Sequence, residues 1–354
     1  MSAAADAGLL AGITVLDLTR LLPGPLATEH LARMGATVLK IEGPAADGQD
    51  DGTRHMFVTR ADREAGRPSL AFRALNEGKQ LREIDLRSDA GRAALLELAR
   101  GADLLVEGFR PGVMDKLGLG WETLHALNPK LVMCAISGYG QRNAWSHRAG
   151  HDINYIAMAG VLEQNATVDG ELAVPNFQIG DLMGGAQAAV AGMLAALLAA
   201  QRGGAGRLVD ISMTHEVYRH HALARIALAA TGRTPAPGRD LLSGGAPCYG
   251  VYRCADGRWM AVGALEMKFW RALCEAVDRA QWIERHWTRG LVPGSPEAMA
   301  LRAEVAALFA TRTMAQWAVL FEAVDACVTP VLRLDELQAH PVHATSQPIA
   351  AAPR

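Results

Sequence analysis

Residues 13–41 read ITVLDLTRLLPGPLATEHLARMGATVLKI, and this stretch decides the expected fold. The apolar run Ile13–Leu18 predicts a short buried strand. A helix is expected from Ala27 to about Met34, with Thr28 able to cap it, and Thr37–Ile41 predicts the next strand. This order of strand, helix and strand indicates a βαβ unit, in which a helix connects two parallel strands.

The same alternation continues along the first part of the chain. Further strands are expected at about 81–86, 104–107, 130–137 and 207–212, with a helix at 89–99. The sequence therefore predicts an α/β fold, with an open, Rossmann-like parallel sheet in a large domain. Ligands of such sheets bind at the carboxyl ends of the strands. No GxGxxG fingerprint follows the first strand, so a dinucleotide is not the expected ligand.

A smaller α+β domain is expected after the Pro- and Gly-rich linker Gly232–Ser243. Beyond the linker, Ala255-Asp-Gly-Arg258 separates two apolar runs and predicts a β-hairpin. Helices are then expected at about 269–277, 296–309 and 314–323, and a strand is expected at about 329–332. The expected division is a large domain at 1–212, a helix and linker at 213–243, a small domain at 244–312, and a segment at 313–354 that returns to the large domain.

The composition excludes several classes of protein. The net charge of −2 lacks the concentrated basic face of a nucleic-acid-binding protein. The eleven histidines show no metal-site spacing, so no metal is expected. The most apolar stretch, Gly184–Ala200, is short for a membrane span and rich in Ala and Gly, which favours a helix buried in protein and no membrane partner.

The five cysteines include no CxxC pair and are expected to be reduced thiols. The first dozen residues lack the basic start and apolar core of a signal peptide. We therefore expect a cytoplasmic protein.

The stretch Gly150–Tyr155, Gly-His-Asp-Ile-Asn-Tyr, carries the clearest chemical signal. It places a proton carrier, His151, beside a carboxylate, Asp152, and adds the polar groups of Asn154 and Tyr155. Adjacent side chains do not share a face of a helix or strand, so the pair would serve different tasks. Taken alone, the same pattern also fits a polar turn in which Asp152 caps the next helix.

Other candidates also have ordinary structural alternatives. Phe109 and Arg110 directly follow an expected strand, where they can stack on a base or hold a phosphate, or simply form an exposed turn. Asp181 can cap the apolar helix that follows it, and Glu266 can be a solvated residue at the exit of the hairpin.

The order and spacing of these motifs make the chain similar to the α-methylacyl-CoA racemases, within the family III CoA-transferase superfamily. The resemblance runs from about Gly12 to His343. Its markers are Leu16-Asp-Leu18 with Pro23-Gly-Pro25, Gly78-Lys79, Gly108–Gly112, Gly150–Tyr155, Gly180-Asp181 and Gly244–Glu266. The resemblance implies an interlocked homodimer, with each site between the large domain of one subunit and the small domain of its partner.

The resemblance also implies a reaction, racemisation of 2-methylacyl-CoA thioesters. His151, assisted by Glu266, would exchange the α-proton on one face of the substrate, and Asp181 on the other. Inversion needs two such bases and a donor for the enolate oxygen, for which the backbone N–H of Asp152, or of a neighbour at the start of its helix, is our candidate. Transferases of the superfamily place one Asp at the position of Asp152, where it forms an anhydride with the acyl group. A CoA transferase that uses Asp152 as nucleophile is therefore the alternative.

Coenzyme A is expected as part of the substrate, with no prosthetic group. Its expected contacts on this chain are Asn76, Lys79, Phe109, Arg110, Arg54, Asn154 and Tyr155. Lys79 would bind a phosphate, since ammonium and guanidinium groups suit phosphate oxygens. The chain departs from the family at Gly43, where relatives often carry a phosphate-binding Arg, and Arg54 is our candidate for the missing charge.

Overall fold

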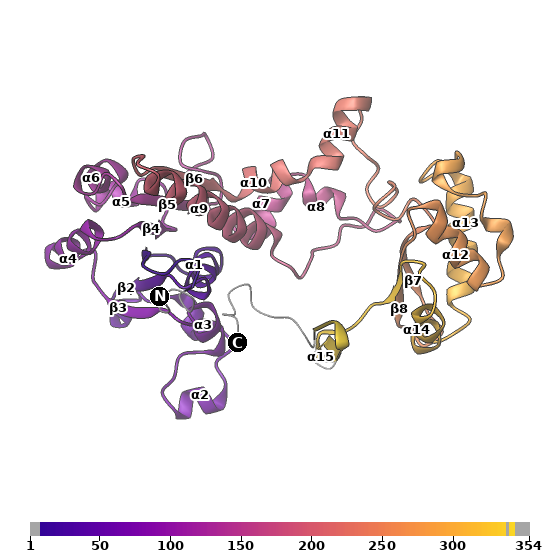
Figure 1. Cartoon of the computed structure of the whole chain (residues 1–354), viewed down its shortest axis with the longest axis horizontal. Coiled ribbons are helices and arrows are strands. Elements are labelled where there is room, and N and C mark those ends of the chain that lie inside the picture. The colour runs from indigo at the N-terminus through magenta and orange to yellow at the C-terminus, as the bar shows by residue number, and fades with distance from the viewer. Residues whose placement is uncertain (1–7, 338–339, 344–354) are drawn as a thin grey trace, which may run out of the picture. The chain divides into compact units, whose positions relative to one another are not determined.

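In the computed structural model, which describes residues 8–337 and 340–343, the expected βαβ unit opens a six-stranded parallel sheet (Figure 1). Its strands are β1 (Thr14–Asp17), β2 (Thr37–Glu42), β3 (Gln80–Glu83), β4 (Leu104–Glu107), β5 (Val132–Ser137) and β6 (Leu208–Ser212). The order across the sheet is β3-β2-β1-β4-β5-β6, and all neighbours are parallel. The chain builds outward from β1 and then returns to its other side, which is the doubly wound arrangement. The predicted α/β fold is confirmed.

Each face of this sheet is covered by its own layer of helices. Val15, on one face, packs in a core with α1 (Pro23–Arg33) and α9 (Ala188–Gln201). Leu16, on the opposite face, packs with α4 (Asp89–Arg100) and α6 (Trp121–Leu127). Because the central strands are buried on both faces, they read as continuous apolar runs in the sequence.

Helix α1 begins at Pro23 rather than at the expected Ala27, and Thr28 is not its cap. Proline suits the first turn of a helix, because its backbone angle is already helical and no N–H is needed there. Thr28 lies inside the helix, and its hydroxyl donates to Asp17 Oδ2 at 2.6 Å.

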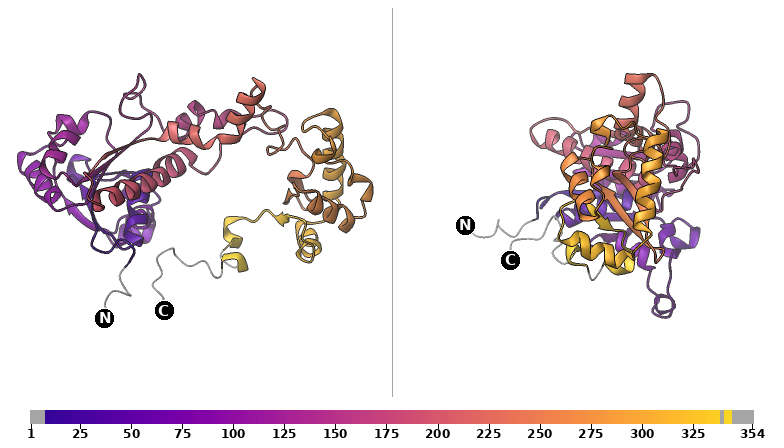
Figure 2. Two further views of the ribbon diagram at one scale, coloured as in Figure 1. Left: turned by 45° about the horizontal axis from the view of Figure 1, so that its top comes forward. Right: turned by 90° about the vertical axis from the view of Figure 1, so that its right-hand side faces the viewer.

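The small antiparallel sheet has the order β7-β8-β9. Its strands are β7 (Tyr249–Arg253), β8 (Trp259–Gly263) and β9 (Val328–Pro330), so the hairpin predicted around Asp256-Gly257 is confirmed. Helices α12 (Met267–Ala276), α13 (Pro296–Phe309) and α14 (Met314–Glu322) pack around it, and Figure 2 views these elements face on at the right.

The chain divides into two units at boundaries that differ from the expected ones. Of the described residues, 8–159 and 176–220 form the first unit, and 160–175 with 221–337 and 340–343 form the second. The expected return of the segment 313–354 to the large domain stays a prediction, and of this segment the structure describes residues 313–337 and 340–343. They belong to the second unit because β9 pairs with β8 and because Trp317 and Phe321 are buried in its core. The rest of the expected return segment, 344–354, lies outside the described residues.

The remaining helices are short, except α11. In the first unit they are α2 (Arg60–Glu64), α3 (Leu70–Leu75), α5 (Val113–Lys116), α7 (Asp152–Met158), α10 (Met213–His220), and the 3-10 helices η1 (Ala45–Asp47) and η2 (Gly52–His55). In the second unit they are α8 (Val161–Gln164), α11 (Ala222–Thr231), α15 (Leu334–Leu337), and the 3-10 helices η4 (Ala280–Trp282), η5 (Trp287–Arg289) and η6 (Pro341–His343). All five cysteines are free.

The apolar helix expected at Gly184–Ala200 is longer and has two parts, a π-helix, η3 (Gly180–Gln187), followed by α9. Within the described residues, the combined run Gly180–Gln201 alone has the length and apolar composition to cross a membrane. Core helices of soluble proteins meet the same criterion, and α9 packs against β5 and β6.

Candidate active site

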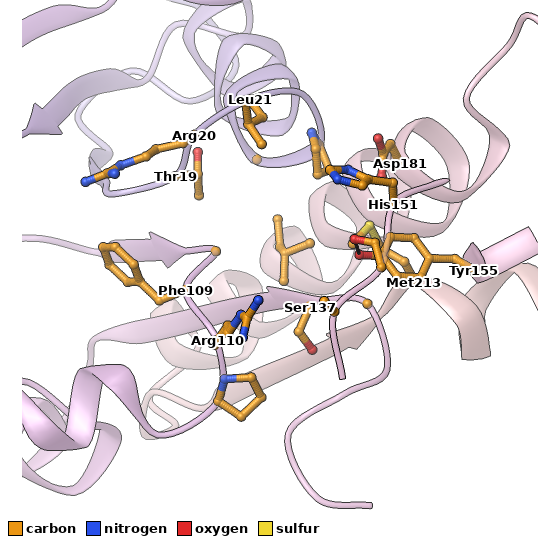
Figure 3. A pocket seen from close by; sticks show the side chains of 18 of the residues that line it. Thr19, Arg20, Leu21, Phe109, Arg110, Ser137, His151, Tyr155, Asp181 and Met213 are labelled. Carbon is orange, nitrogen blue, oxygen red and sulfur yellow. Dashed lines mark hydrogen bonds between the residues drawn. The ribbon is translucent and has the colours of Figure 1, made fainter. Parts of the chain in front are cut away.

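A cavity of about 530 Å³ opens in the first unit at the carboxyl ends of β1, β4 and β5 (Figure 3). The chain reverses its direction across the sheet between β1 and β4, which is where doubly wound sheets bind ligands. The segments that follow these strands form part of its walls, and the starts of α7 and η3 form a further part. The lining includes Thr19, Arg20, Leu21, Phe109, Arg110, Ser137, Arg148, His151, Asn154, Tyr155, Asp181 and Met213.

His151 lies at the cavity directly before the first residue of α7, with its side chain exposed. Its backbone N–H donates to Asn154 Oδ1 at 3.0 Å, and its carbonyl oxygen accepts from the Asn154 N–H at 2.8 Å. Asn154 therefore fixes the backbone from which the imidazole projects. We predicted Asn154 as a cofactor contact, and this positioning role was not visible in the sequence.

Asp181 reaches the same cavity from the first turn of η3. Its backbone N–H donates to Asp152 Oδ1 at 3.0 Å. Asp152 itself is not among the described residues that line the cavity. The structure therefore brings His151 and Asp181 to one cavity and places Asp152 as the link between their two elements. π-Helical turns are rare and are frequent at functional sites.

Burial raises the pKa of Asp181 to about 6, and the nearby Asp152 carboxylate adds to this effect. The charge of His151 acts in the opposite direction. An ordinary Asp is almost fully ionised near neutral pH, whereas a carboxyl group with this pKa is partly protonated there. Asp181 can therefore serve either as an acid or as a base, and raised carboxyl pKa values of this kind are common in active sites.

Tyr155 supports the site from within. Its hydroxyl donates to the Gly150 carbonyl oxygen, directly before His151, and its ring packs edge-on against Tyr139 at 5.4 Å between centroids. A Cβ atom at Gly138 would lie 2.3 Å from Tyr155 Cε1, and one at Gly150 would lie 2.7 Å from the same atom. We predicted Tyr155 as a cofactor contact, but its hydroxyl is engaged by the protein.

Phe109 and Arg110 lie where the sequence placed them, directly after β4, and both line the cavity. The Phe109 N–H donates to Glu107 Oε2 at 2.7 Å, which fixes the turn. Sequence reasoning missed two further cations of the lining, Arg20 and Arg148. The place of Arg20, shortly after the first strand, was a usable signal, whereas Arg148 lies in a long polar segment without one.

The side chains of Lys79 and Asn76 are engaged inside the protein, and their contacts with a cofactor stay a prediction. The Lys79 ammonium is fully buried and donates to Asp17 Oδ2 at 3.0 Å, to the Pro25 carbonyl oxygen at 2.8 Å and to Asn76 Oδ1 at 3.0 Å. An ammonium group has three donors, and all are used. The Asn76 amide donates to the Phe72 carbonyl oxygen at 2.9 Å. Asp17 is the physical reason that the Lys79 ammonium is buried, because a buried carboxylate needs a compensating charge.

Arg54 is likewise engaged inside the protein. Its guanidinium donates to both carboxylate oxygens of Glu42, at 3.1 and 2.5 Å, and its central carbon lies 3.8 Å from the centre of the Phe72 ring. The Glu42 carboxylate neutralises this guanidinium, and the role of Arg54 as a replacement for the phosphate-binding Arg missing at Gly43 stays a prediction.

Glu266 belongs to the second unit, where it directly precedes α12 and is exposed. Its expected assistance to His151 stays a prediction. Among the residues that the structure describes, no group of three or more His, Cys, Asp or Glu side chains is placed to hold a metal ion.

Comparison with known proteins identifies relatives along nearly the whole chain. The model of CoA-transferase family III matches residues 10–353. The chain is 34% identical over 333 residues to the alpha-methylacyl-CoA racemase of Homo sapiens, which covers 94% of this chain and 80% of the relative. It is also 34% identical over 303 residues to the succinyl-CoA:mesaconate CoA-transferase of Haloarcula marismortui, covering 84% and 74% of the two chains.

A solved structure supports the same grouping. The CAIB/BAIF family protein of Brucella suis matches with a TM-score of 0.78 and 25% identity, covering 95% of this chain and 87% of that one. The match of the family model over almost all residues, together with these relatives, shows that the chain belongs to CoA-transferase family III.

Proposed function

We propose that this protein racemises 2-methylacyl-CoA thioesters by removing and returning the α-proton. One observation carries the proposal: His151 and Asp181, from two different elements, both line one cavity, and Asp181 has its pKa raised to about 6. The resemblance to racemases at 34% identity supports the choice of substrate class.

The chemistry requires two proton carriers in opposite protonation states. With His151 neutral and Asp181 protonated, the imidazole takes the α-proton from one face of the carbon. The electron pair of the broken C–H bond moves into the enolate, and Asp181 returns its proton to the opposite face. The pair then holds the same number of protons with the roles exchanged, so the opposite enantiomer reacts in reverse. A carboxyl group with a pKa of about 6 suits this exchange with an imidazole.

Other groups of the site assist in separate ways. The enolate oxygen needs a prearranged hydrogen-bond donor. The first N–H groups of α7, beginning with that of Asp152, have no acceptor within their own helix and can serve as this donor. Phe109 and Arg110 are our candidates for the coenzyme A part, whose binding energy acts far from the reacting carbon. Glu266 would assist His151 from the partner in a homodimer.

The alternative is CoA transfer to a free carboxylic acid, with Asp152 as nucleophile. The similarity to a CoA-transferase at 34% identity favours it. The hydrogen bond from the Asp181 N–H to Asp152 Oδ1 favours racemisation, because it gives this carboxylate a structural task away from the cavity lining.

The deciding experiment is NMR of a single enantiomer of a 2-methylacyl-CoA in D₂O with enzyme and no acceptor acid. Deuterium at the α-carbon together with loss of chirality is the expected result. The variants His151→Ala and Asp181→Asn should each abolish racemisation while the thioester still binds by calorimetry. No exchange in the wild type, with CoA transfer once an acid is added, would establish the transferase instead.

A further inference from the structure

A buried ion pair lies beneath one wall of the cavity, outside the acid/base residues. Lys40, on β2, and Asp51, in the loop that follows, have fully buried side chains, with Nζ and Oδ2 3.1 Å apart. Such a pair is weak evidence for a stabilising role, because desolvation of two charges offsets their attraction. The contacts that the two residues make with the cavity wall suggest a different task.

Both partners hold the backbone of the segment after β1. Asp51 Oδ1 accepts a hydrogen bond from the Leu21 N–H at 3.0 Å, and the Lys40 ammonium donates to the Thr19 carbonyl oxygen. Thr19 and Leu21 both line the cavity, and Arg20 lies between them. The ion pair therefore anchors this wall on each side of Arg20.

Leu21 adopts a backbone conformation that requires such anchoring. Its φ is +67°, in the left-handed region that residues with bulky side chains rarely occupy. The loop leaves little room beside its side chain, since a Cβ atom at Gly52 would lie 3.3 Å from Leu21 Cδ2. Strain of this kind persists only where the surroundings enforce it, and it gathers at functional sites. In Figure 3, Leu21 lies between Arg20 on one side and His151 with Asp181 on the other.

We propose that Lys40 and Asp51 are positioning residues that hold Leu21 against the bound thioester, so that its α-carbon stays between His151 and Asp181. The inference rests on the proposed function, because it concerns the same cavity and the same proton transfers. Leu21 is the contact with the substrate, and the ion pair acts through it.

The test compares three variants of buried carboxylates. Asp51→Ala removes the acceptor of the Leu21 N–H, whereas Asp51→Asn keeps an oxygen in its place. Asp62→Ala is the matched control, since Asp62 is also buried and paired, with Arg73 at 2.6 Å, but makes its contacts around α2. Asp51→Ala should lower kcat about 10- to 100-fold, as expected for misplaced reacting groups, with the Kd of the thioester changed less than about 3-fold. Asp51→Asn should recover most of the loss.

Melting temperatures separate this effect from simple destabilisation. Asp62→Ala should lower Tm comparably and leave kcat within about 3-fold of the wild type, because proteins that remain folded at the assay temperature keep their site geometry. Equal effects of Asp51→Ala and Asp62→Ala on kcat at similar Tm would overturn the positioning role.

Leu21→Gly provides a test that does not depend on a destabilised fold. Glycine adopts a φ of +67° freely, so the backbone is retained while the side chain is lost. This variant should lower kcat about 10-fold. Adding Asp51→Ala to Leu21→Gly should lower kcat little further, because Asp51 acts through Leu21 and the two effects are therefore not additive. A wild-type kcat in Leu21→Gly, or fully additive losses, would contradict the proposal.

The inference and the proposed function fail in different ways. Exchange in the wild type with an unchanged kcat in Leu21→Gly overturns the positioning role alone. Absence of exchange in the wild type overturns the proposed function, and this inference with it, whatever the variants do.

Discussion

Asp152 Oδ1 accepts a hydrogen bond from the backbone N–H of Asp181 at 3.0 Å. The bond joins the start of α7, which carries His151, to the first turn of η3. The spacing of the two proposed proton carriers is therefore set by a contact that neither makes with its own side chain. Gly180 permits this approach, since a Cβ atom there would lie 2.9 Å from Asp152 Oδ1.

Asp152→Asn should therefore preserve α-proton exchange to within about 5-fold, because an amide oxygen still accepts the Asp181 N–H, and Asp152→Ala should lower it about 10- to 100-fold through misplacement. The measurement is deuterium incorporation by NMR. Complete loss of turnover in Asp152→Asn, together with hydroxylamine trapping of an acyl group on wild-type Asp152, would instead identify this residue as a transferase nucleophile.

The raised pKa of Asp181 predicts a pH dependence of stability. Because its pKa lies at about 6 in the folded protein and at the ordinary 3.8 in the unfolded chain, the folded state binds the proton more tightly. The contribution is fully present below pH 3.8 and is lost as the pH rises to about 6. Asp181→Asn should remove this contribution, which lowers the free energy of unfolding by roughly 1 kcal/mol over that pH range after allowance for solvent screening. Urea unfolding at several pH values measures it, and an unchanged slope would contradict the raised pKa.

Glu107 predicts a second effect at higher pH. Burial raises the pKa of this carboxyl group from 4.5 to about 8, with the Phe109 N–H acting in the opposite direction. Its contribution to stability is present below pH 4.5 and is lost as the pH rises through about 8. Glu107→Gln keeps an oxygen for the Phe109 N–H and should be more stable than the wild type at pH 9, by on the order of 2 kcal/mol. Glu97→Gln, on the exposed surface of α4, is the control and should leave the stability at pH 9 unchanged.

Replacing Gly138 with a larger residue should lower both stability and activity. Gly138→Ala would place a Cβ atom 2.3 Å from Tyr155 Cε1, so the ring that supports Gly150 and His151 must move. We expect a loss of about 2 kcal/mol or more in the free energy of unfolding, as for other overpacked sites. Gly101→Ala is the matched control, because a Cβ atom there meets nothing within 4 Å. Chemical denaturation compares the two variants, and equal stability of both would show that Tyr155 has room to shift.

The sheet was predictable because its signal is local. The run Leu104–Glu107 was expected as a strand and forms β4 with the same bounds, since strands buried on both faces are continuously apolar. The Asp256-Gly257 turn likewise predicted its hairpin, because few residues accept the backbone angles of a tight turn. The strand expected at about 329–332 also forms, as β9, but its pairing with β8 was not predicted, because apolar alternation does not say which sheet a strand joins.

The residues that face the site were harder to predict, because the contacts that decide them join segments far apart in the sequence. The pairing of Lys79 with Asp17 was not visible, because Asp17 lies 62 residues away in the sequence. Asp152 and Asp181 are 29 residues apart, and their hydrogen bond has no signature in either motif. The sequence by itself determined the strands, the hairpin and the presence of His151 and Asp181, because these depend on residue type and short-range order. Only the tertiary structure decided which charges face the cavity and which neutralise one another, because that depends on how distant segments pack around the ends of the sheet.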